Sequence, residues 1–181
     1  MRLVTPADLD ELRAQIDCQQ GLRIATLGVE FDTFEFARTG ATLVDRAVAY
    51  STPSGDRIAG LGTAWRATAS GVDRFSSLRR ALEELDQPEL TAFVGFSFLP
   101  DGPTSNMWDG FEASEVFIPR ITLQDTDVGT RLTVVIPPDE TPEATLELLG
   151  SMQKPKWVSV EDTGDHSIES HPPVSDWASS V

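Results

Sequence analysis

The stretch FVGFSFLPDGPTSNMWDGFEASEVFIPR, residues 93–120, constrains the fold most, because two aromatic-rich apolar segments flank a polar connection. The first segment is apolar at both odd and even positions, with Val94, Phe96 and Phe98 on one side and Phe93 and Leu99 on the other. A short apolar run bounded by turn residues is typical of a buried strand. We interpret TAFVGFSFLP as a central strand, PDGPTSNMWDGF as a connection and EVFIPR as the start of the next strand.

The aromatic side chains of this stretch have two possible roles. Aromatic residues supply much of the buried area in protein cores, which favours a core position for Phe93, Phe96 and Phe98. The alternative is a platform of rings that binds a ligand. The pattern by itself favours the core.

Period-two alternation predicts further strands. In LRIATLGVEFD, one face holds Ala25, Leu27, Val29 and Phe31. In RIAGLGTAWRAT, read as a single strand, one face holds Ala59, Leu61, Thr63, Trp65 and Ala67. The segments VFIPRITLQ and RLTVVIPP flank DTDVGT, whose Asp and Gly are typical of a hairpin, and Pro119 indicates a bulge or an edge position.

Three segments carry helix signals. In TPADLDELRAQI, Thr5 is the expected N-cap, Pro6 the first helical residue, and Asp8 favours the positive end of the helix. Its apolar stripe is formed by Leu9, Leu12 and Ile16. The second helix, FSSLRRALEEL, has Ser76 or Ser77 as expected cap, ends before Pro88, and has an apolar face of Leu78, Leu82 and Leu85. The third, TPEATLELLGSM, begins at Thr141 and Pro142 and is expected to stop at Gly150.

These strands and helices alternate irregularly, so the sequence predicts an α+β fold, an antiparallel-rich sheet with amphipathic helices packed on it. A chain of 181 residues suggests one domain, or one domain with an extra segment. We expect that domain to span residues 1–154, followed at 155–181 by a linker and the start of a further lobe whose remainder is missing.

Composition excludes several partners. The formal net charge of −15 repels phosphate backbones and anionic lipid, so we expect neither nucleic acid nor membrane as a partner. No apolar run approaches the roughly 18 residues of a membrane span. The single cysteine, Cys18, rules out an intrachain disulfide and favours a reducing compartment, which predicts a cytoplasmic protein.

Two candidate sites fail on their local pattern. Gly60 and Gly62 in GLGTAW imitate the start of a dinucleotide fingerprint, but the third glycine is absent and the stretch has a strand pattern. Cys18 has no histidine near it in sequence to act as a base for a thiol nucleophile. We therefore expect no cofactor site at the glycines and an incidental role for Cys18.

We also expect no catalytic or metal-binding site at the remaining ionisable residues. His166 and His171 flank Glu169, but their segment is polar, Pro-flanked and lacks a helix that would align two imidazoles. In an acidic chain, pairs such as Glu83 with Glu84, or Asp125 with Asp127, arise by chance and are expected on solvated faces and turns. The chain has two lysines, Lys154 and Lys156, and both follow the third helix.

The end of the sequence carries a helix start. Ser175 is a cap candidate, and Trp177 and Val181 lie at the i, i+4 spacing of one helix face. So short a segment cannot sustain a helix alone, because nucleation is costly. We hypothesise that the chain is a fragment and that this helix continues beyond residue 181.

Three stretches carry a family resemblance: IAGLGTAWRATASGVDRFSSLRRALEEL, AFVGFSFLPDGPTSNMWDGFEASEVFIPRITL and SDWASSV. Together they resemble the N-terminal half of isochorismate synthases, in the chorismate-utilising enzyme family, over roughly residues 22–181. The motifs recur there in this order. A Leu-Leu-Glu-Ser stretch, which binds tryptophan in the related anthranilate and aminodeoxychorismate synthases, does not occur here, and this favours the isochorismate branch.

The resemblance implies the N-terminal lobe of a two-lobed α/β sandwich. The complete enzyme is an isomerase that converts chorismate to isochorismate with Mg²⁺, a lysine base and a glutamate acid, for menaquinone or for siderophore and salicylate synthesis. Those residues belong to the C-terminal lobe, so we assign no catalytic, cofactor-binding or metal-binding residue to this chain.

Three hypotheses follow from this resemblance. The chain is an inactive N-terminal fragment of the enzyme, a standalone interaction or regulatory protein with the same lobe fold, or one half of a split enzyme. In the first and third, its partner is the chorismate-binding lobe, in cis or in trans.

Overall fold

The computed structural model describes residues 3–19, 21–102, 111–127 and 129–152. These residues form antiparallel sheets and helices, which confirms the predicted α+β class. The helices are α1 (Pro6–Asp17), α2 (Thr33–Gly40), α3 (Arg74–Leu85) and α4 (Glu143–Ser151). The strands are β1 (Arg23–Val29), β2 (Ala47–Ser51), β3 (Arg57–Leu61), β4 (Trp65–Ala69), β5 (Phe93–Phe96), β6 (Ser114–Ile118), β7 (Ile121–Thr126) and β8 (Gly129–Ile136). The predicted boundary at 154–155 lies outside the described residues.

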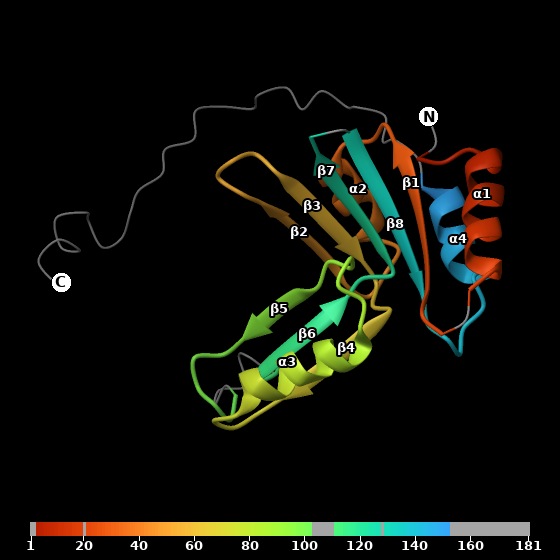
Figure 1. Cartoon of the computed structure of the whole chain (residues 1–181). Coiled ribbons are helices and arrows are strands. Elements are labelled where there is room, and N and C mark those ends of the chain that lie inside the picture. The colour runs from red at the N-terminus through yellow and green to blue at the C-terminus, as the bar shows by residue number, and fades with distance from the viewer. Residues whose placement is uncertain (1–2, 20, 103–110, 128, 153–181) are drawn as a thin grey trace, which may run out of the picture.

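The strands form two separate antiparallel sheets (Figure 1). The five-stranded sheet has the order β1-β8-β7-β3-β2, and the three-stranded sheet has the order β4-β6-β5. The predicted β7–β8 hairpin is confirmed, with Thr126 paired to Gly129. The strand face predicted for β1 is also confirmed, because Ala25 and Phe31 are buried and Leu27 and Val29 pack against the core.

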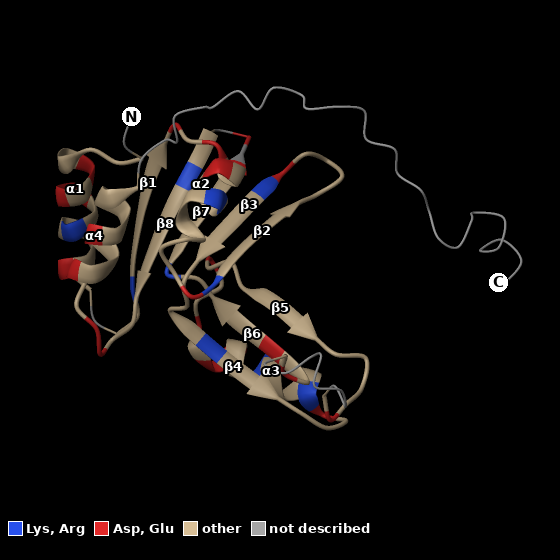
Figure 2. Cartoon of the chain, turned by 180° about the vertical axis from the view of Figure 1, so that it is seen from behind, with Lys and Arg blue, Asp and Glu red and all other residues tan. Residues whose placement is uncertain are grey.

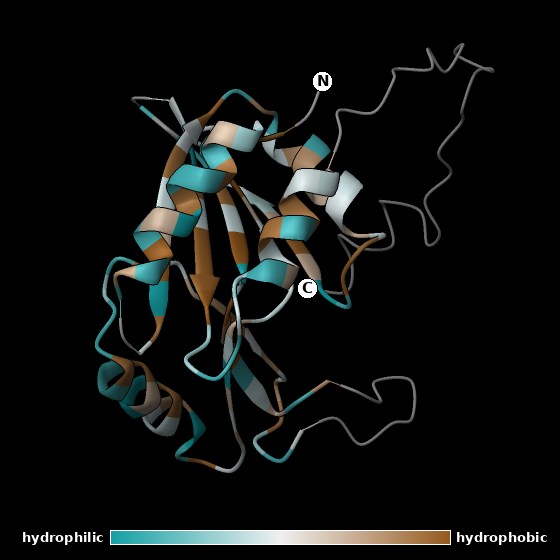
Figure 3. Cartoon of the chain, turned by 90° about the vertical axis from the view of Figure 1, so that its right-hand side faces the viewer, coloured by the Kyte–Doolittle hydropathy of each residue, from teal (hydrophilic) through white to brown (hydrophobic). Residues whose placement is uncertain are grey.

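The core lies between the five-stranded sheet and helices α1, α2 and α4. It joins helix side chains to one face of the sheet. The buried helix side chains are Leu12, Ile16, Phe36, Leu146 and Leu149. The buried sheet residues include Ala25, Ala59, Leu61, Ile121, Leu123, Leu132, Val134 and Ile136. Figure 3 shows the helix layer in front of these largely hydrophobic strands.

The first helix begins as predicted. The Thr5 hydroxyl accepts a hydrogen bond from the Asp8 backbone N–H at 3.3 Å, and the Asp8 carboxylate accepts one from the Thr5 N–H at 2.7 Å. Both bonds satisfy backbone donors that a helix start leaves unpaired, in a capping box. Leu12 and Ile16 are fully buried, which confirms the predicted stripe.

Helix α2 was not among the predicted helices, although its start carries a signal. Asp32 is followed three residues later by Glu35, the spacing of a capping box, and Asp32 does cap the helix. Its carboxylate accepts hydrogen bonds from the N–H groups of Phe34 and Glu35 at 3.0 and 2.9 Å. The helix has eight residues and depends on packing against β3, because so short a helix is marginal alone.

The predicted start of α3 and the predicted end of α4 were wrong. Helix α3 begins at Arg74, before Ser76 and Ser77, because buried Arg74 donates to the Ser97 carbonyl at 3.2 Å and so ties this turn to the segment after β5. Helix α4 continues through Gly150 to Ser151. A Cβ at Gly150 would lie 3.2 Å from Leu9 Cδ1, so the absence of a side chain at this residue allows α4 to pack closely against α1.

Two predicted strands are each divided between the two sheets. RIAGLGTAWRAT forms β3 and β4, and the chain turns at Gly62, whose φ is +63°. VFIPRITLQ forms β6 and β7, and the chain passes between sheets at Pro119, which has no N–H to donate to a ladder. A Cβ at Gly60 would lie 2.4 Å from Pro119 Cγ, so the two crossings fit together only with glycine at residue 60.

The prediction of a buried central strand over residues 91–100 was wrong. Strand β5 covers only Phe93–Phe96 and lies at the edge of the three-stranded sheet. Phe96 is 61% exposed and Phe98 99% exposed, whereas Phe93 stacks on Phe117 at 5.6 Å between ring centroids. Helix α3 packs on β4 and β6 and leaves β5 largely uncovered, so apolar composition alone could not locate the core.

Candidate functional site

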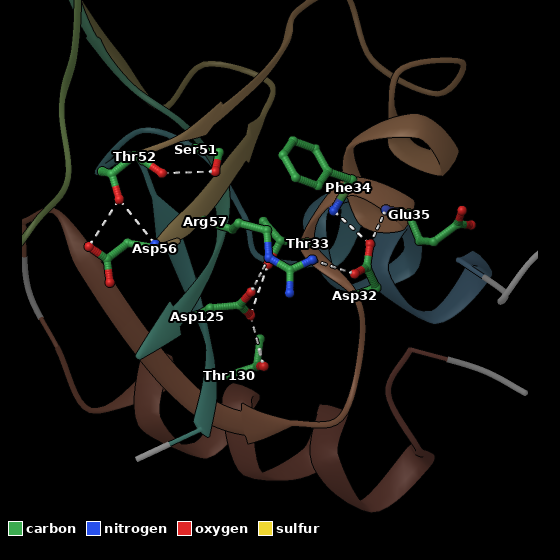
Figure 4. A network of polar contacts seen from close by, with 10 residues as sticks. All are labelled: Asp32, Thr33, Phe34, Glu35, Ser51, Thr52, Asp56, Arg57, Asp125 and Thr130. Carbon is green, nitrogen blue, oxygen red and sulfur yellow. Dashed lines mark hydrogen bonds and ion pairs between the residues drawn. The ribbon is translucent and has the colours of Figure 1, made fainter. Parts of the chain in front are cut away.

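The first polar cluster lies where α2 joins the five-stranded sheet, with Arg57 at its centre (Figure 4). The Arg57 guanidinium donates to Asp32 through Nη1 at 2.9 Å and to Asp125 through Nε at 3.1 Å. Asp125 also accepts hydrogen bonds from the hydroxyls of Thr33 and Thr130, both at 3.0 Å. The cluster therefore connects three strands to the start of one helix.

This arrangement fits a structural tie better than acid–base chemistry. Both carboxylates already accept several hydrogen bonds, and each is paired with the same cation. Asp127, the other member of the predicted acidic pair, is exposed in the turn after β7, as expected. Asp125 itself is partly buried and bonded, which its position beside a turn did not predict.

The second cluster lies on the three-stranded sheet, whose strands β4 and β6 carry charged residues in Figure 2. Phe96 contacts Phe75 of α3 and pairs with Ser114, so Glu115, the next residue of β6, faces away from α3. Glu115 of β6 receives hydrogen bonds from Arg66 Nε at 2.9 Å and from Arg46 Nη1 at 3.1 Å. Arg66 also donates to Glu112 at 3.0 Å. The Arg46 guanidinium lies 4.6 Å from the ring centroid of Phe117, in a cation–π contact.

The charges of this cluster shift the Glu115 pKa in opposite directions. Partial burial raises it, but the hydrogen bonds from Arg66 and Arg46 outweigh burial, so the pKa lies below the usual value of a glutamate. Glu115 is therefore a carboxylate at neutral pH and cannot donate a proton as a general acid there. Two arginines and two glutamates balance in charge, so the cluster offers no net attraction to an anion.

A third pair sits at the crossing from β6 to β7. Arg120 makes a bidentate ion pair with Glu140, with one of its bonds at 2.6 Å, and this pairing lowers the Glu140 pKa. The Arg120 carbonyl accepts the Val135 N–H at 2.8 Å, so the residue is also held through its backbone. This pair secures the crossing against the loop after β8.

The two glycines and the cysteine that the sequence singled out have roles or contacts within the fold. Gly60 lies in β3 as its pattern indicated, and its missing side chain makes room for Pro119. Gly62 forms the turn into β4. Cys18 is exposed at the C-cap of α1, where its thiol donates to the Gln15 carbonyl at 3.1 Å.

Of the other ionisable candidates, the structure describes Glu83 and Glu84. Glu83 lies on the exposed side of α3, 3.9 Å from Arg79, and Glu84 is also exposed, as predicted. The histidines at 166 and 171 and the lysines at 154 and 156 lie outside the described residues. Among the residues that the structure describes, no three His, Cys, Asp or Glu side chains converge in a way that could hold a metal ion.

The residues at the centre of these polar clusters were not predicted from the sequence. Arg46, Arg57, Arg66 and Glu115 lie in strands or next to them, and their partners are 25 to 69 residues away. Only Asp32 had a local signal, its capping-box spacing to Glu35. In the described part of the chain, no helix has the length and apolar character needed to cross a membrane.

Comparison with known proteins matches the chain to a protein family. The family model described as chorismate binding enzyme matches residues 8–178. A search of curated proteins found nothing that matches this chain.

Proposed function

The chain belongs to the chorismate binding enzyme family, and we propose that it is the N-terminal scaffold half of an isochorismate synthase. In this proposal the complete enzyme converts chorismate to isochorismate for menaquinone or for siderophore and salicylate synthesis. The catalytic lobe is supplied in cis or by a separate chain, and the 181 residues are inactive without it.

The observation that carries the proposal is the five-stranded sheet, whose described helices α1, α2 and α4 all pack on one face. Its other face presents Ile24, Val48 and Ile58, all only partly buried, and Tyr50, which is 56% exposed. Sheets that bury apolar residues on both faces need a layer on each side. A second lobe of a sandwich is a layer of that kind.

The charged side chains of the described part support a scaffold role. Glu115, Glu140 and Asp125 are each held by arginines, and the pKa shifts of Glu115 and Glu140 are downward. A general acid that works near neutral pH needs a pKa raised toward that pH. These groups join elements of the fold.

The resemblance also implies Mg²⁺ in the complete enzyme, and the described residues do not fit it. Mg²⁺ binds through carboxylates that remain free to coordinate it. Here the partly buried carboxylates are already engaged by arginine or threonine side chains, and no metal-binding group of three converges among the described residues. We derive no chemical step through the metal in this chain.

The second candidate is a standalone interaction or regulatory protein of the same family. It is favoured by the continuous core between the sheet and α1, α2 and α4, because a domain with its own core can fold alone. This candidate predicts that the purified chain unfolds cooperatively and gains no activity when a catalytic lobe is added.

The test is turnover of chorismate with Mg²⁺, followed by separation of chorismate from isochorismate. The scaffold proposal predicts no product from the chain alone and product once the catalytic lobe of the same enzyme is present. Product from the chain alone would overturn it, and no gain with the lobe would favour the standalone candidate. The lobe itself is sought in the reading frame after codon 181 or in a neighbouring gene.

A pair of variants locates the lobe contact. Ile58→Lys places a charge on the sheet face on which no described helix packs, and should reduce the lobe-dependent activity at least tenfold. Leu43→Lys introduces the same charge at a half-exposed residue after α2, on the helix side, and should leave that activity unchanged. Equal lobe-dependent activity of the two variants would show that the lobe does not contact this face of the sheet.

A further inference from the structure

The free edge of β5 has unused backbone hydrogen-bonding groups. The Ser97 N–H donates to the Ala113 carbonyl at 2.9 Å, so the backbone groups of Ser97 point toward β6. Successive residues of a strand direct these groups to opposite sides, so those of Val94 and Phe96 point to the open edge. No described residue hydrogen-bonds to them across that edge.

Strand β1, which is also an edge strand, is protected in a way that β5 is not. The Gln15 side chain donates to the Thr26 carbonyl at 3.1 Å and accepts from its N–H at 2.9 Å. One helical turn later, Gln19 does the same for Ile24, at 2.6 and 2.8 Å. Gln15 of α1 and Gln19, which follows the end of α1, thus occupy the backbone groups of Thr26 and Ile24 at this edge, which hinders strand addition there.

The side chains along β5 and just after it form an exposed apolar strip. Phe75, Phe96 and Phe98 are 49%, 61% and 99% exposed, and Phe75 meets Phe96 edge to face at 5.4 Å between centroids. The exposed parts of these rings equal about two whole phenylalanines, or roughly 300–500 Å². Val94 and Leu99, each at least half exposed, extend the strip to the size that marks a contact surface.

An apolar hollow lies at the other end of the same strand. Its volume is about 440 Å³, and its lining includes Leu82 and Leu85 of α3 together with Leu90 and Ala92 of the segment that enters β5. Ala92 has the same parity as Val94 and Phe96, so its side chain lies on the same face of the strand. The strip therefore has a bulky end at Phe98 and a hollow end at Ala92.

We propose that the β5 edge binds the β5 edge of a second copy of this chain, in an antiparallel pair with its two-fold axis at Gly95. Val94 of one copy then pairs with Phe96 of the other, and each pair exchanges two backbone hydrogen bonds. The two sheets become one six-stranded sheet. Because α3 lies over β4 and β6, the space above the two β5 strands stays open for the exposed side chains.

Self-complementarity is the reason to choose a second copy over another partner. In the register centred on Gly95, Phe98 of one copy lies opposite Ala92 of the other, beside the hollow. The almost fully exposed ring thus reaches an apolar hollow large enough for it, twice in the dimer. An interface of this kind uses the same patch on both copies, as two-fold dimers do.

The size and charge of the surfaces set the expected affinity. The strip supplies part of the roughly 800 Å² per partner of a standard interface, so we expect a dissociation constant of about micromolar order. Each chain carries a formal charge of −15, so two copies repel at long range. Added salt screens this repulsion, and the dimer should tighten as ionic strength rises.

Cross-linking tests the register directly. Residues on a two-fold axis between antiparallel strands lie close enough for a disulfide. In the background of Cys18→Ser, Gly95→Cys should form a covalent dimer under mild oxidation, because a Cβ at Gly95 meets only the Glu115 side chain, at 3.8 Å or more. The control Thr68→Cys, exposed on β4 at the opposite edge of that sheet, should form no covalent dimer. Equal cross-linking of both variants would overturn the register.

Mass measured by light scattering or sedimentation over a concentration series tests the dimer itself. Val94→Lys and Phe98→Ala should weaken the dimer at least tenfold, while Tyr50→Lys and Tyr50→Ala, at a similarly exposed residue of β2, should not. Circular dichroism and urea unfolding verify that each variant is folded. A monomeric wild-type chain, or a dimer that is insensitive to both β5 variants, would overturn the proposal. A wild-type chain that is monomeric alone and binds a catalytic lobe less tightly after Val94→Lys would also overturn the proposal, and would assign the β5 edge to the lobe.

Discussion

Replacing Gly60 with alanine tests whether the two chain crossings between the sheets depend on one missing side chain. A Cβ at this residue would lie 2.4 Å from Pro119 Cγ, 2.9 Å from Pro119 Cβ and 3.2 Å from Val48 Cγ1. The proline ring is stiff and buried where the chain leaves β6, so it has little freedom to move away. The contact therefore has to be relieved by shifting the backbone at the crossing.

Overpacking of this kind costs about 1–3 kcal/mol of unfolding free energy. The matched control is Gly28→Ala in β1 of the same sheet, where an added Cβ would meet no atom within 4 Å. Neither glycine has a positive φ, so alanine introduces no backbone strain at either residue. Gly28→Ala should be neutral or stabilising by up to about 0.5–1 kcal/mol, because alanine loses less backbone entropy on folding.

The assay is equilibrium urea unfolding followed by circular dichroism at constant pH. With a slope of about 2 kcal/mol per molar urea, the Gly60→Ala midpoint should fall by roughly 0.5–1.5 M relative to wild type. The Gly28→Ala midpoint should stay constant or rise. A Gly60→Ala variant as stable as Gly28→Ala would show that the Pro119 crossing adapts at no cost and would refute this reasoning.

The remaining predictions concern the core, the Arg57 cluster and acid stability, and all use the same urea assay. Phe36→Ala removes a fully buried ring of α2 and should cost about 3–5 kcal/mol; a loss below about 1 kcal/mol would mean that α2 is not part of the cooperative core. Arg57→Ala leaves two carboxylates without their shared cation and should lower the midpoint more than Arg38→Ala, which removes one i,i+3 ion pair from the surface of α2; the reverse order would contradict the structural role of the cluster. The hydrogen bond from Arg13 lowers the Glu143 pKa from 4.5 to about 2, so this pair stabilises the fold above about pH 4.5 and loses its effect as pH falls toward 2. The midpoints of wild type and Arg13→Gln should therefore converge over that window, and a gap that stays constant would exclude the pair as its cause.

Local signals were reliable where a short segment decides its own conformation. The Thr5–Asp8 capping box and the stripe of Leu12 and Ile16 predicted α1, because both depend on residues one or two turns apart. The β7–β8 hairpin followed from its turn residues for the same reason. Helix α2 was not predicted, although Asp32 carried a cap signal, because a helix of eight residues has too few turns to show a clear hydrophobic periodicity.

The polar clusters could not be predicted from single residues. Arg46 and Glu115 are 69 positions apart, and Arg57 and Asp125 are 68 apart, so nothing local joins them. Their contacts arise because the sheet order places β3 beside β7, and β6 between β4 and β5. Of the acidic pairs that the sequence offered, Glu83 and Glu84 are exposed on α3, and of Asp125 and Asp127 only Asp125 enters a cluster.

By itself, the sequence determined helices α1, α3 and α4, the β7–β8 hairpin and the α+β class. It also determined the resemblance to isochorismate synthases, which the family match supports at the coarser level of chorismate binding enzymes. Only the tertiary structure decided that RIAGLGTAWRAT and VFIPRITLQ are each shared between two sheets, and that the phenylalanines of FVGFSF lie at an edge. The physical reason is that hydrophobicity indicates which side chains would be stabilised by burial. Whether they are buried depends on which other elements of the fold pack over them. At β5 the described chain provides a strand on one side and leaves the other open.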